Sequence, residues 1–282
     1  MDLQPPDPAG SLASRYAPSG LEQILRQALI QAGLNPDRLA CDDVAAIDQL
    51  HVGGRAASRR LADRAGFSQA ERVLDLGCGT GGTTRLLAHD HGLRVTGLDI
   101  TPDFVSTGRW LSRATGLAAR TDFVHGDAQC LPFAMATFDA VWAQHVFLNV
   151  PDLPQALDEI VRVLRPGGRL LIHEVVAGSG EGALQLPVPW ADLPRHSHLP
   201  DLATLKARLE TIGLRPLFME DISEQALQWR RKHTGREARG ESGALNPSLI
   251  FGERFFVMGR NVMENLAAGR IRIIQGGWER AG

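Results

Sequence analysis

The size and charge of the chain exclude several classes of protein. It has 282 residues, of which 44% are hydrophobic and 22% are charged, with a formal net charge of −2. Neither half carries a basic block that would neutralise a run of phosphates, so we expect no nucleic acid and no anionic membrane as an obligatory partner. A small-molecule substrate fits this composition better.

The sequence gives no sign of export or of a membrane span. The first residues, MDLQPPDPAG, are acidic and proline-rich, and no stretch of about 18 uninterrupted apolar residues occurs. The cysteines, Cys41, Cys78 and Cys130, lack the spacing that a zinc site or a disulfide framework would need. We therefore expect a cytoplasmic protein.

Residues 1–66 are predicted to form a tail and a helical lid. Residues 1 to about 19 are rich in Pro, Gly and Ser, a composition typical of a mobile terminus. The stretch LEQILRQALIQAGL then has apolar positions at helical spacing and stops at Gly33, and a second helical stretch runs through DDVAAIDQL. These helices are candidates to cover a ligand.

From residue 67 to residue 282 the pattern predicts one α/β domain. Short apolar runs alternate with helix-length segments, which indicates a parallel sheet covered on both faces, a doubly wound fold. The runs are 72–77, 94–100, 122–127, 138–144 and 169–175, with a sixth strand expected at 215–223 and a seventh at 269–279. The proline-rich residues 184–200 are predicted to be a long substrate loop.

Polar residues and glycines follow the first five runs at the end where such a sheet binds ligands. They are GCGTGG (77–82), Asp99, GDA (126–128), QHVFLN (144–149) and HE (173–174). The glycines let backbone N–H groups approach a ligand, and Asp99, 20 residues beyond Gly79, has the spacing of a carboxylate that binds a ribose. Taken alone, G-x-G-x-x-G also fits a dinucleotide.

Five segments resemble the successive motifs of class I S-adenosylmethionine-dependent methyltransferases over about residues 71–176: VLDLGCGTGG, VTGLDIT, FVHGDAQCLPF, FDAVWAQHV and RVLRPGGRLLIHEV. The resemblance implies S-adenosylmethionine as cofactor and S-adenosylhomocysteine as product. It also implies a Rossmann-like methyltransferase fold whose mostly parallel sheet has seven strands, the last antiparallel between the fifth and sixth.

The same resemblance assigns the cofactor residues. It places Gly77, Gly79 and Gly81 under the methionine part, Asp99 at the ribose, Ile100 and Thr101 near the adenine, Asp127 and Ala128 at the adenine amino end, and the backbone of Gln144 at the amino-acid moiety. Gly82 then becomes a position of close helix packing.

The flanking segments 48–62, 187–192 and 269–275 are similar to small-molecule methyltransferases near the sarcosine/dimethylglycine N-methyltransferase group, and akin to quinone C-methyltransferases. This predicts methyl transfer to a small molecule, first of all to an amine nitrogen of an amino-acid-like metabolite. C- or O-methylation of a quinone-like, isoprenoid or other secondary metabolite is the alternative. A non-catalytic cofactor-binding subunit and an NAD-type oxidoreductase are weaker readings; Asp75 and the missing tyrosine–lysine pair count against the oxidoreductase.

Three residues are candidate catalytic groups. His145 follows the fourth run, where a neutral histidine could accept a proton from the acceptor or make only structural contacts. Asn149 could orient the substrate or end a turn. The only tyrosine, Tyr16, offers an aromatic face to a sulfonium or a methylammonium, if its segment folds over the cofactor.

Four more residues are candidates for substrate binding. His51 and Arg55 lie in HVGGR, where the arginine could clamp a carboxylate; Glu174 could pair with a cationic acceptor, and Trp190 could wall the pocket. Each also has a structural reading, as a turn, a solvated strand end or a loop anchor. No Asp/Asn cluster resembles a magnesium site, so we expect no metal, and the oligomeric state is open, with a homodimer among the options.

Overall fold

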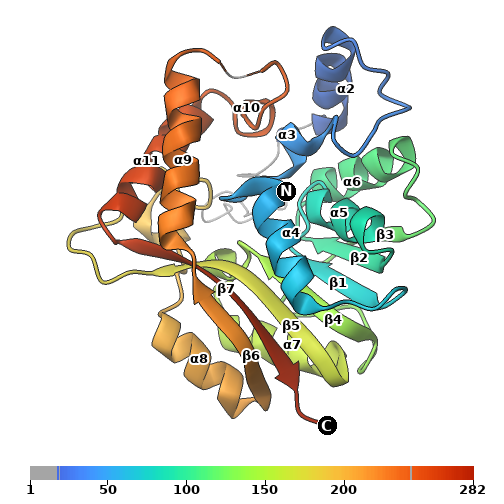
Figure 1. Ribbon diagram of the computed structural model, residues 1–282, viewed down its shortest axis with the longest axis vertical. Coiled ribbons are helices and arrows are strands. Elements are labelled where there is room, and N and C mark those ends of the chain that lie inside the picture. Colours follow the sequence, from blue (N-terminus) through green and yellow to red (C-terminus); the bar gives the residue numbers. More distant parts are fainter. Residues whose placement is uncertain (1–17, 19, 242) are drawn as a thin grey trace, which may run out of the picture.

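The computed structural model describes residue 18, residues 20–241 and residues 243–282 (Figure 1). Within these residues a single sheet has the strand order β3-β2-β1-β4-β5-β7-β6. Strands β1 to β5 pair in parallel, and β7 runs antiparallel to both β5 and β6. The expected doubly wound sheet with an inserted antiparallel last strand is confirmed. The strands are β1 (Arg72–Leu76), β2 (Arg94–Asp99), β3 (Thr121–His125), β4 (Phe138–Gln144), β5 (Leu164–Ala177), β6 (Leu214–Asp221) and β7 (Ile271–Arg280).

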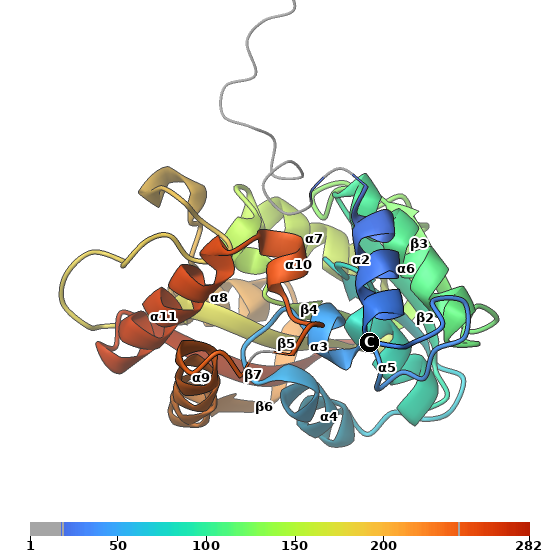
Figure 2. The ribbon, with the colours of Figure 1, turned by 90° about the horizontal axis from the view of Figure 1, so that it is seen from above.

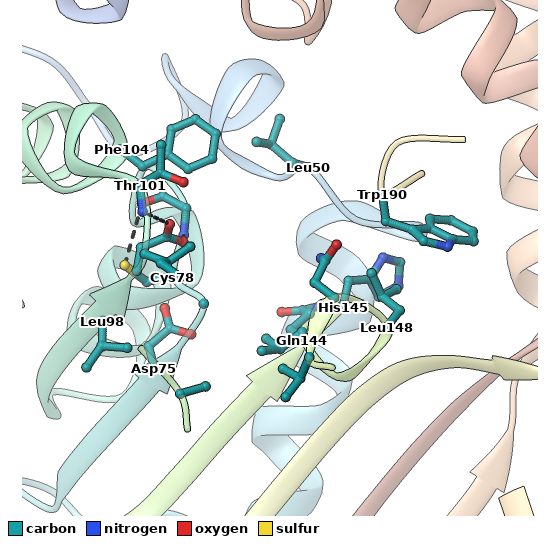
Figure 3. Close-up of a pocket in the computed structure, with 18 of the residues that line it drawn as sticks. Leu50, Asp75, Cys78, Leu98, Thr101, Phe104, Gln144, His145, Leu148 and Trp190 are labelled. Atoms are coloured by element: carbon teal, nitrogen blue, oxygen red, sulfur yellow. Dashed lines mark hydrogen bonds between the residues drawn. The ribbon is translucent and has the colours of Figure 1, made fainter. Parts of the chain in front are cut away.

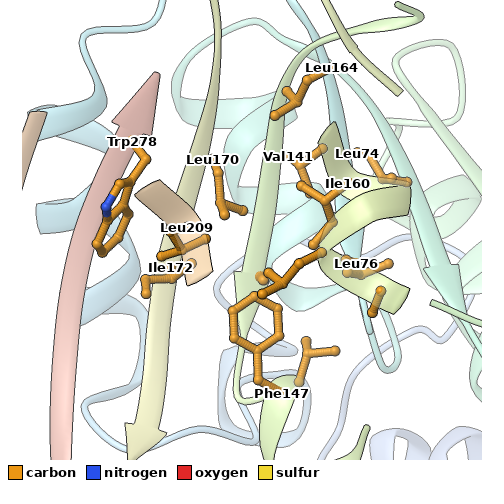
Figure 4. Close-up of a cluster of buried hydrophobic side chains, with 14 of the residues drawn as sticks. Leu74, Leu76, Val141, Phe147, Ile160, Leu164, Leu170, Ile172, Leu209 and Trp278 are labelled. Carbon is orange, nitrogen blue, oxygen red and sulfur yellow. The ribbon is translucent and has the colours of Figure 1, made fainter. Parts of the chain in front are cut away.

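Helices cover both faces of the sheet (Figure 2). Helices α7 and α8 pack on one face over the apolar side chains shown in Figure 4, which include Leu74, Val141 and Leu170. Helices α4 and α5 pack on the other face against Val73 and Trp142. The helices are α2 (Leu21–Gln31), α3 (Ala45–Asp48), α4 (Gly54–Ala65), α5 (Gly82–Asp90), α6 (Pro102–Ala114), α7 (Leu153–Val163), α8 (Leu202–Thr211), α9 (Ser223–Ala238), α10 (Ser248–Phe251) and α11 (Arg254–Ala267), with 3-10 turns η1 (Phe147–Asn149) and η2 (Pro194–His196).

Only a short part of the expected N-terminal lid reaches the ligand-binding edge of the sheet. Helix α4 buries Leu61 and Ala65 on the sheet, so it belongs to the body of the domain. Helix α2 packs against α6, and the indole of Trp110 donates a hydrogen bond to the carbonyl of Pro36. The second expected helix shrinks to the single turn α3. What reaches the ligand-binding edge of the sheet is the short segment 48–51.

The described helices include none that is both long and apolar enough to cross a membrane. In Figure 1, α3 and α10 lie between α2 on one side and the α9–α11 pair on the other. Segments from both ends of the chain therefore meet above the strands β1 and β4, where the polar strand ends lie.

Candidate active site

A deep pocket opens at the carboxyl ends of β1, β2 and β4 (Figure 3). The space between its lining residues, together with its open mouth, is about 1220 Å³. The lining includes Asp48, Leu50, His51, Asp75, Gly77, Gly79, Thr83, Asp99, Ile100, Thr101, Phe104, Asp127, Ala128, Gln129, Gln144, His145, Leu148, Asn149, Pro189, Trp190 and Phe251.

Asp99 braces the glycine loop at one side of this pocket. One carboxylate oxygen accepts a hydrogen bond from the backbone N–H of Gly79 and the other from that of Thr101, each at 2.8 Å. Gly79 has φ +55°, and a Cβ built on it would meet no atom within 4 Å. Because a carboxylate has about four lone-pair directions, Asp99 keeps capacity for ribose hydroxyls. The residues present fit an adenosine cofactor.

The next two glycines have different roles. Gly81 is not among the residues that line the pocket, and its place under the cofactor stays a prediction. A Cβ on Gly81 would come within 2.5 Å of the ring of Phe123, so this glycine permits packing of the loop on β3. A Cβ on Gly82 would lie 2.1 Å from the carbonyl oxygen of Asp48. The predicted close packing at Gly82 is confirmed.

The ends of β2 and β3 meet in the same pocket. Ile100, Thr101, Asp127 and Ala128 all line it, although no contact with a cofactor tests their predicted roles. One oxygen of Asp127 accepts a hydrogen bond from the N–H of Gln129 at 2.8 Å. Gln129 also lines the pocket, and a glutamine in a turn gave no signal in the sequence.

Gln144 enters the site through its side chain. Its amide oxygen accepts hydrogen bonds from Ser58, Thr83 and Trp142, at 3.2, 3.0 and 3.1 Å. Its amide nitrogen is buried and has no partner among the described residues. The predicted backbone role stays a prediction, and the side chain is a polar group of the site that the sequence did not indicate.

Three histidine rings gather beside Gln144. The ring centroids of His51, His145 and His173 lie 5.1 to 6.0 Å apart. Burial lowers the pKa of His145 to about 3 and that of His51 to about 4, so both rings are neutral at physiological pH. His145 has φ +56°, a left-handed conformation that is costly for a residue with a side chain and often marks a functional site. The Nε2 atom of His145 is buried and has no partner among the described residues.

The contacts of His51 and His173 fix which ring nitrogen carries the proton. Nε2 of His51 lies 3.1 Å from the carbonyl oxygen of Gly54. Because a carbonyl only accepts, Nε2 donates, and Nδ1 is the acceptor. The Gln275 amide lies 2.8 Å from Nδ1 of His173 and donates to it. The sequence placed His173 among the polar strand ends but did not indicate its partner Gln275, which is 102 positions away in the chain.

Trp190 and Asn149 line the pocket beside the histidines, and their roles toward a substrate stay predictions. The Trp190 indole is 4% exposed and donates to the hydroxyl of Ser197 at 2.9 Å, which anchors it within the loop 184–200. Phe251 reaches the same side from α10. It is far from any motif, so the sequence gave no reason to select it.

Two predicted substrate residues lie outside the pocket. Arg55 donates to the carbonyl of Cys41 and to the carboxylate of Asp42, so its guanidinium is already engaged. Glu174 is fully buried, and one of its oxygens accepts from the backbone N–H groups of Val146 and Phe147, at 2.8 and 3.2 Å. Burial raises the pKa of Glu174 to about 8. Its observed contacts are with the turn after His145, and it does not line the pocket. Tyr16 lies outside the described residues.

Residues 74–172 match the family described as Methyltransferase domain. Methyltransferase GfsG of Streptomyces halstedii is 34% identical over 185 residues, which cover 65% of this chain and 66% of GfsG. The chain thus spans just under two thirds of that relative's length. Other relatives carry the names of N-, O- and C-methyltransferases.

Solved structures share the fold. Phosphoethanolamine N-methyltransferase 2 of Haemonchus contortus, in complex with phosphomonomethylethanolamine and S-adenosylhomocysteine, is 17% identical with a TM-score of 0.71, over 94% of this chain and 61% of that one. The 4+2 cyclase SpnF is 25% identical with a TM-score of 0.66, over 94% of this chain and 97% of that one. S-adenosylmethionine, and not a nicotinamide dinucleotide, is the cofactor that these matches and the Asp99 loop support. Residues 74–172 are therefore a methyltransferase domain, and the chain has the fold of the class I S-adenosylmethionine-dependent methyltransferases.

Proposed function

We propose that this protein methylates a hydroxyl oxygen of an uncharged, largely apolar small molecule, with S-adenosylmethionine as the methyl donor. The observation that carries the proposal is the side of the pocket away from β2 and β3, here called the acceptor wall. Among the described residues it contains no lysine, arginine or carboxylate. Its members are Leu50, His51, His145, Leu148, Asn149, Pro189, Trp190 and Phe251.

An amino-acid-like acceptor, the first expectation from the sequence, fits this wall poorly. Such an acceptor carries a carboxylate, and a phosphorylated amine carries a phosphate. The charged residues that line the pocket are Asp48, Asp75, Asp99 and Asp127, all acidic. Burying an anion without a cationic partner costs several kcal/mol, on the order of 3–5. The alternative acceptors, with an oxygen or carbon nucleophile and an apolar body, fit the wall better.

Neutral histidines favour an oxygen nucleophile over a carbon nucleophile. A hydroxyl of the acceptor can donate a hydrogen bond to a ring nitrogen of His145, which orients an oxygen lone pair for in-line attack. When bound, S-adenosylmethionine supplies an electrophilic methyl group on a positively charged sulfur. As the O–CH₃ bond forms and the S–CH₃ bond breaks, the hydroxyl proton becomes strongly acidic, so even a weakly basic imidazole can take it.

The remaining wall residues align the acceptor and exclude water. Alignment and exclusion of water can lower the barrier of a displacement by up to roughly 7–11 kcal/mol. Trp190, Leu148 and Phe251 supply apolar surface, and Asn149 supplies a polar group close to His145 in the chain. The catalytic role of Tyr16 stays a prediction, since its segment is outside the described residues.

The test is transfer of a trideuteromethyl group from labelled S-adenosylmethionine. The protein is incubated with the lipophilic and the polar fractions of a metabolite extract, and labelled products are identified by mass spectrometry and NMR. We expect the label on an oxygen of an uncharged compound from the lipophilic fraction. Label on the nitrogen of sarcosine or phosphoethanolamine, with none on a hydroxyl, would overturn the proposal.

The likeness to SpnF supports a second candidate, a cyclisation without methyl transfer. SpnF is 25% identical over nearly its whole length and is named a cyclase. An uncharged apolar wall would also suit a hydrocarbon chain that folds on itself. The same experiment separates the two activities, because a cyclase would consume a compound and give a product of unchanged mass, with no label.

A further inference from the structure

We infer that Asp48 and the side-chain amide of Gln144 form a subsite for the amino-acid end of the cofactor. The Asp48 carboxylate accepts from the α-ammonium group, and the Gln144 amide donates to the α-carboxylate. This assignment does not depend on the acceptor and therefore stands apart from the proposed function.

Asp48 has a buried carboxylate of which only one oxygen is bound by Arg85. Its side chain is 4% exposed, and one oxygen accepts from Arg85 at 2.8 Å. The other oxygen is buried and accepts no hydrogen bond of ordinary geometry among the described residues, and the side chain of Gln49 is the polar group nearest to this carboxylate apart from Arg85. A buried carboxylate oxygen without a donor is costly, and Asp48 lines the pocket. A cationic ligand group would remove that cost.

Arg85 makes Asp48 a fixed part of the site. Its guanidinium is 1% exposed and also donates to the carbonyl oxygen of Thr80 in the glycine loop, at 2.8 Å. The backbone of Asp48 is held as well, because Gly82 allows its carbonyl oxygen to approach the start of α5. The segment that carries Asp48 is therefore a rigid wall of the pocket.

Gln144 offers the complementary group. Three donors surround its amide oxygen, those of Ser58, Thr83 and Trp142, which fixes the orientation of the amide. Its nitrogen must then be the buried donor that has no partner. An amide donor can bind a carboxylate without adding charge.

The two groups meet at the first turn of α5. The carboxylate of Asp48 accepts from Arg85 in this turn, and the amide oxygen of Gln144 accepts from Thr83 in the same turn. Asp48, Thr83 and Gln144 line the pocket together with Gly77 and Gly79. Of the chemical groups on the cofactor, only its amino-acid end carries both a cation and an anion, so it alone uses both orphan atoms.

The experiment is calorimetric binding of three ligands to the full chain. The ligands are S-adenosylhomocysteine, its deaminated analogue, which keeps the carboxylate, and 5′-methylthioadenosine, which lacks the whole amino-acid end. In Asp48→Asn we expect roughly 10- to 100-fold weaker binding of S-adenosylhomocysteine, the range for a hydrogen bond to a charged group. The affinities for the deaminated analogue and for 5′-methylthioadenosine should change less than about threefold.

A second variant tests the other half of the subsite. Gln144→Glu keeps the oxygen that Ser58, Thr83 and Trp142 need, and it replaces the donor by an anion. It should weaken both carboxylate-bearing ligands and spare 5′-methylthioadenosine. The matched control is Asp42→Asn, whose side chain is 85% exposed and which should change none of the three affinities.

Two results would overturn the assignment. If Asp48→Asn weakened all three ligands equally, Asp48 would only support the fold. If neither Asp48→Asn nor Gln144→Glu altered the affinity for S-adenosylhomocysteine, the two orphan atoms would bind water and not the cofactor. Unfolding curves without ligand check that each variant is folded, and 5′-methylthioadenosine binding provides the same check within the titration.

Discussion

The two sides of the pocket are built in different ways, and they face each other across the open space in Figure 3. The cofactor side comes from the ends of β1, β2 and β3, which are neighbours in one sheet. The acceptor wall comes from four segments, 50–51, 145–149, 189–190 and 251, which only the folded chain brings together. The cofactor side is thus a property of the sheet, whereas the acceptor wall depends on loops and helices that differ from one chain to another.

Their electrostatics differ as well. The cofactor side carries the buried carboxylates of Asp75 and Asp99, and burial raises the pKa of Asp75 to about 7. The described residues of the acceptor wall carry no formal charge at neutral pH, because His51 and His145 have lowered pKa values. One side is suited to a charged, hydrogen-bonding cofactor, and the other to a neutral acceptor. The following variants are chosen to separate the two sides.

Asp99→Ala should have the largest effect. It removes the acceptor for the N–H groups of Gly79 and Thr101. Because two charge-assisted hydrogen bonds are lost, we expect the affinity for S-adenosylhomocysteine to fall by a factor of roughly 100 or more. Calorimetry measures this loss. The exposed Asp63→Ala on α4 is the control, and an unchanged affinity in Asp99→Ala would show that the loop needs no brace.

His145→Asn should break turnover and leave the cofactor side intact. Asparagine tolerates the left-handed backbone of this position but cannot take a proton. We expect a turnover roughly 10²- to 10⁴-fold lower and an affinity for S-adenosylhomocysteine within about twofold. His89→Asn, at an exposed histidine, is the matched control. Equal losses of turnover and cofactor affinity in His145→Asn would contradict the division between the two sides.

Trp190→Leu should act on the acceptor alone. The indole is almost fully buried in the wall, and its loss predicts a KM for the acceptor roughly 10-fold higher, with unchanged cofactor affinity. Steady-state kinetics at saturating S-adenosylmethionine measure it. The control Leu193→Ala removes an exposed apolar group from the same loop and should leave the KM for the acceptor unchanged. If Trp190→Leu and the wild type had a similar KM, Trp190 would not belong to the acceptor wall.

Glu174→Gln should have the smallest effect, on stability alone. Burial raises the pKa of Glu174 to about 8 from an ordinary value of 4.5. Because its folded-state pKa is higher than its unfolded-state pKa, the stability it contributes is complete below about pH 4.5 and is lost as the pH rises through about 8. Glutamine still accepts from Val146 and Phe147 but cannot ionise.

The measurement is the Tm of Glu174→Gln minus that of wild type at pH 5 and at pH 9. This difference should be more positive at pH 9 by several degrees. Glu181→Gln, at an exposed glutamate, should show no such trend. A difference that is the same at both pH values would mean that Glu174 does not become harder to ionise when the chain folds.

The sequence predicted which strand ends come together on the cofactor side because the signals for strands are local. Apolar runs define the strands, and Asp99 follows one of them directly, so the sheet order brings these residues together. The glycine loop shows where local reasoning ends, since Gly81 and Gly82 are neighbours yet pack against Phe123 and Asp48, far away in the chain.

The acceptor wall was predicted less well because its signals are long-range. Arg55 and Glu174 were expected in the pocket, but they lie outside its lining, where Arg55 pairs with Asp42 and one oxygen of Glu174 accepts from a backbone turn. The contact of His173 with Gln275 was missed, as was the buried pair of Arg85 and Asp48. The residues next to them in the sequence give no indication of their partners in the fold.

The most direct test of the account is a comparison of kcat/KM for two acceptors that differ by one charge. The pair 2-naphthol and 6-hydroxy-2-naphthoate has the same ring and hydroxyl, and only the second carries a carboxylate. An acceptor wall without a cation predicts a kcat/KM at least roughly 30-fold higher for 2-naphthol, a difference of about 2 kcal/mol for an unpaired buried charge. An equal or higher kcat/KM for the naphthoate would contradict an uncharged acceptor.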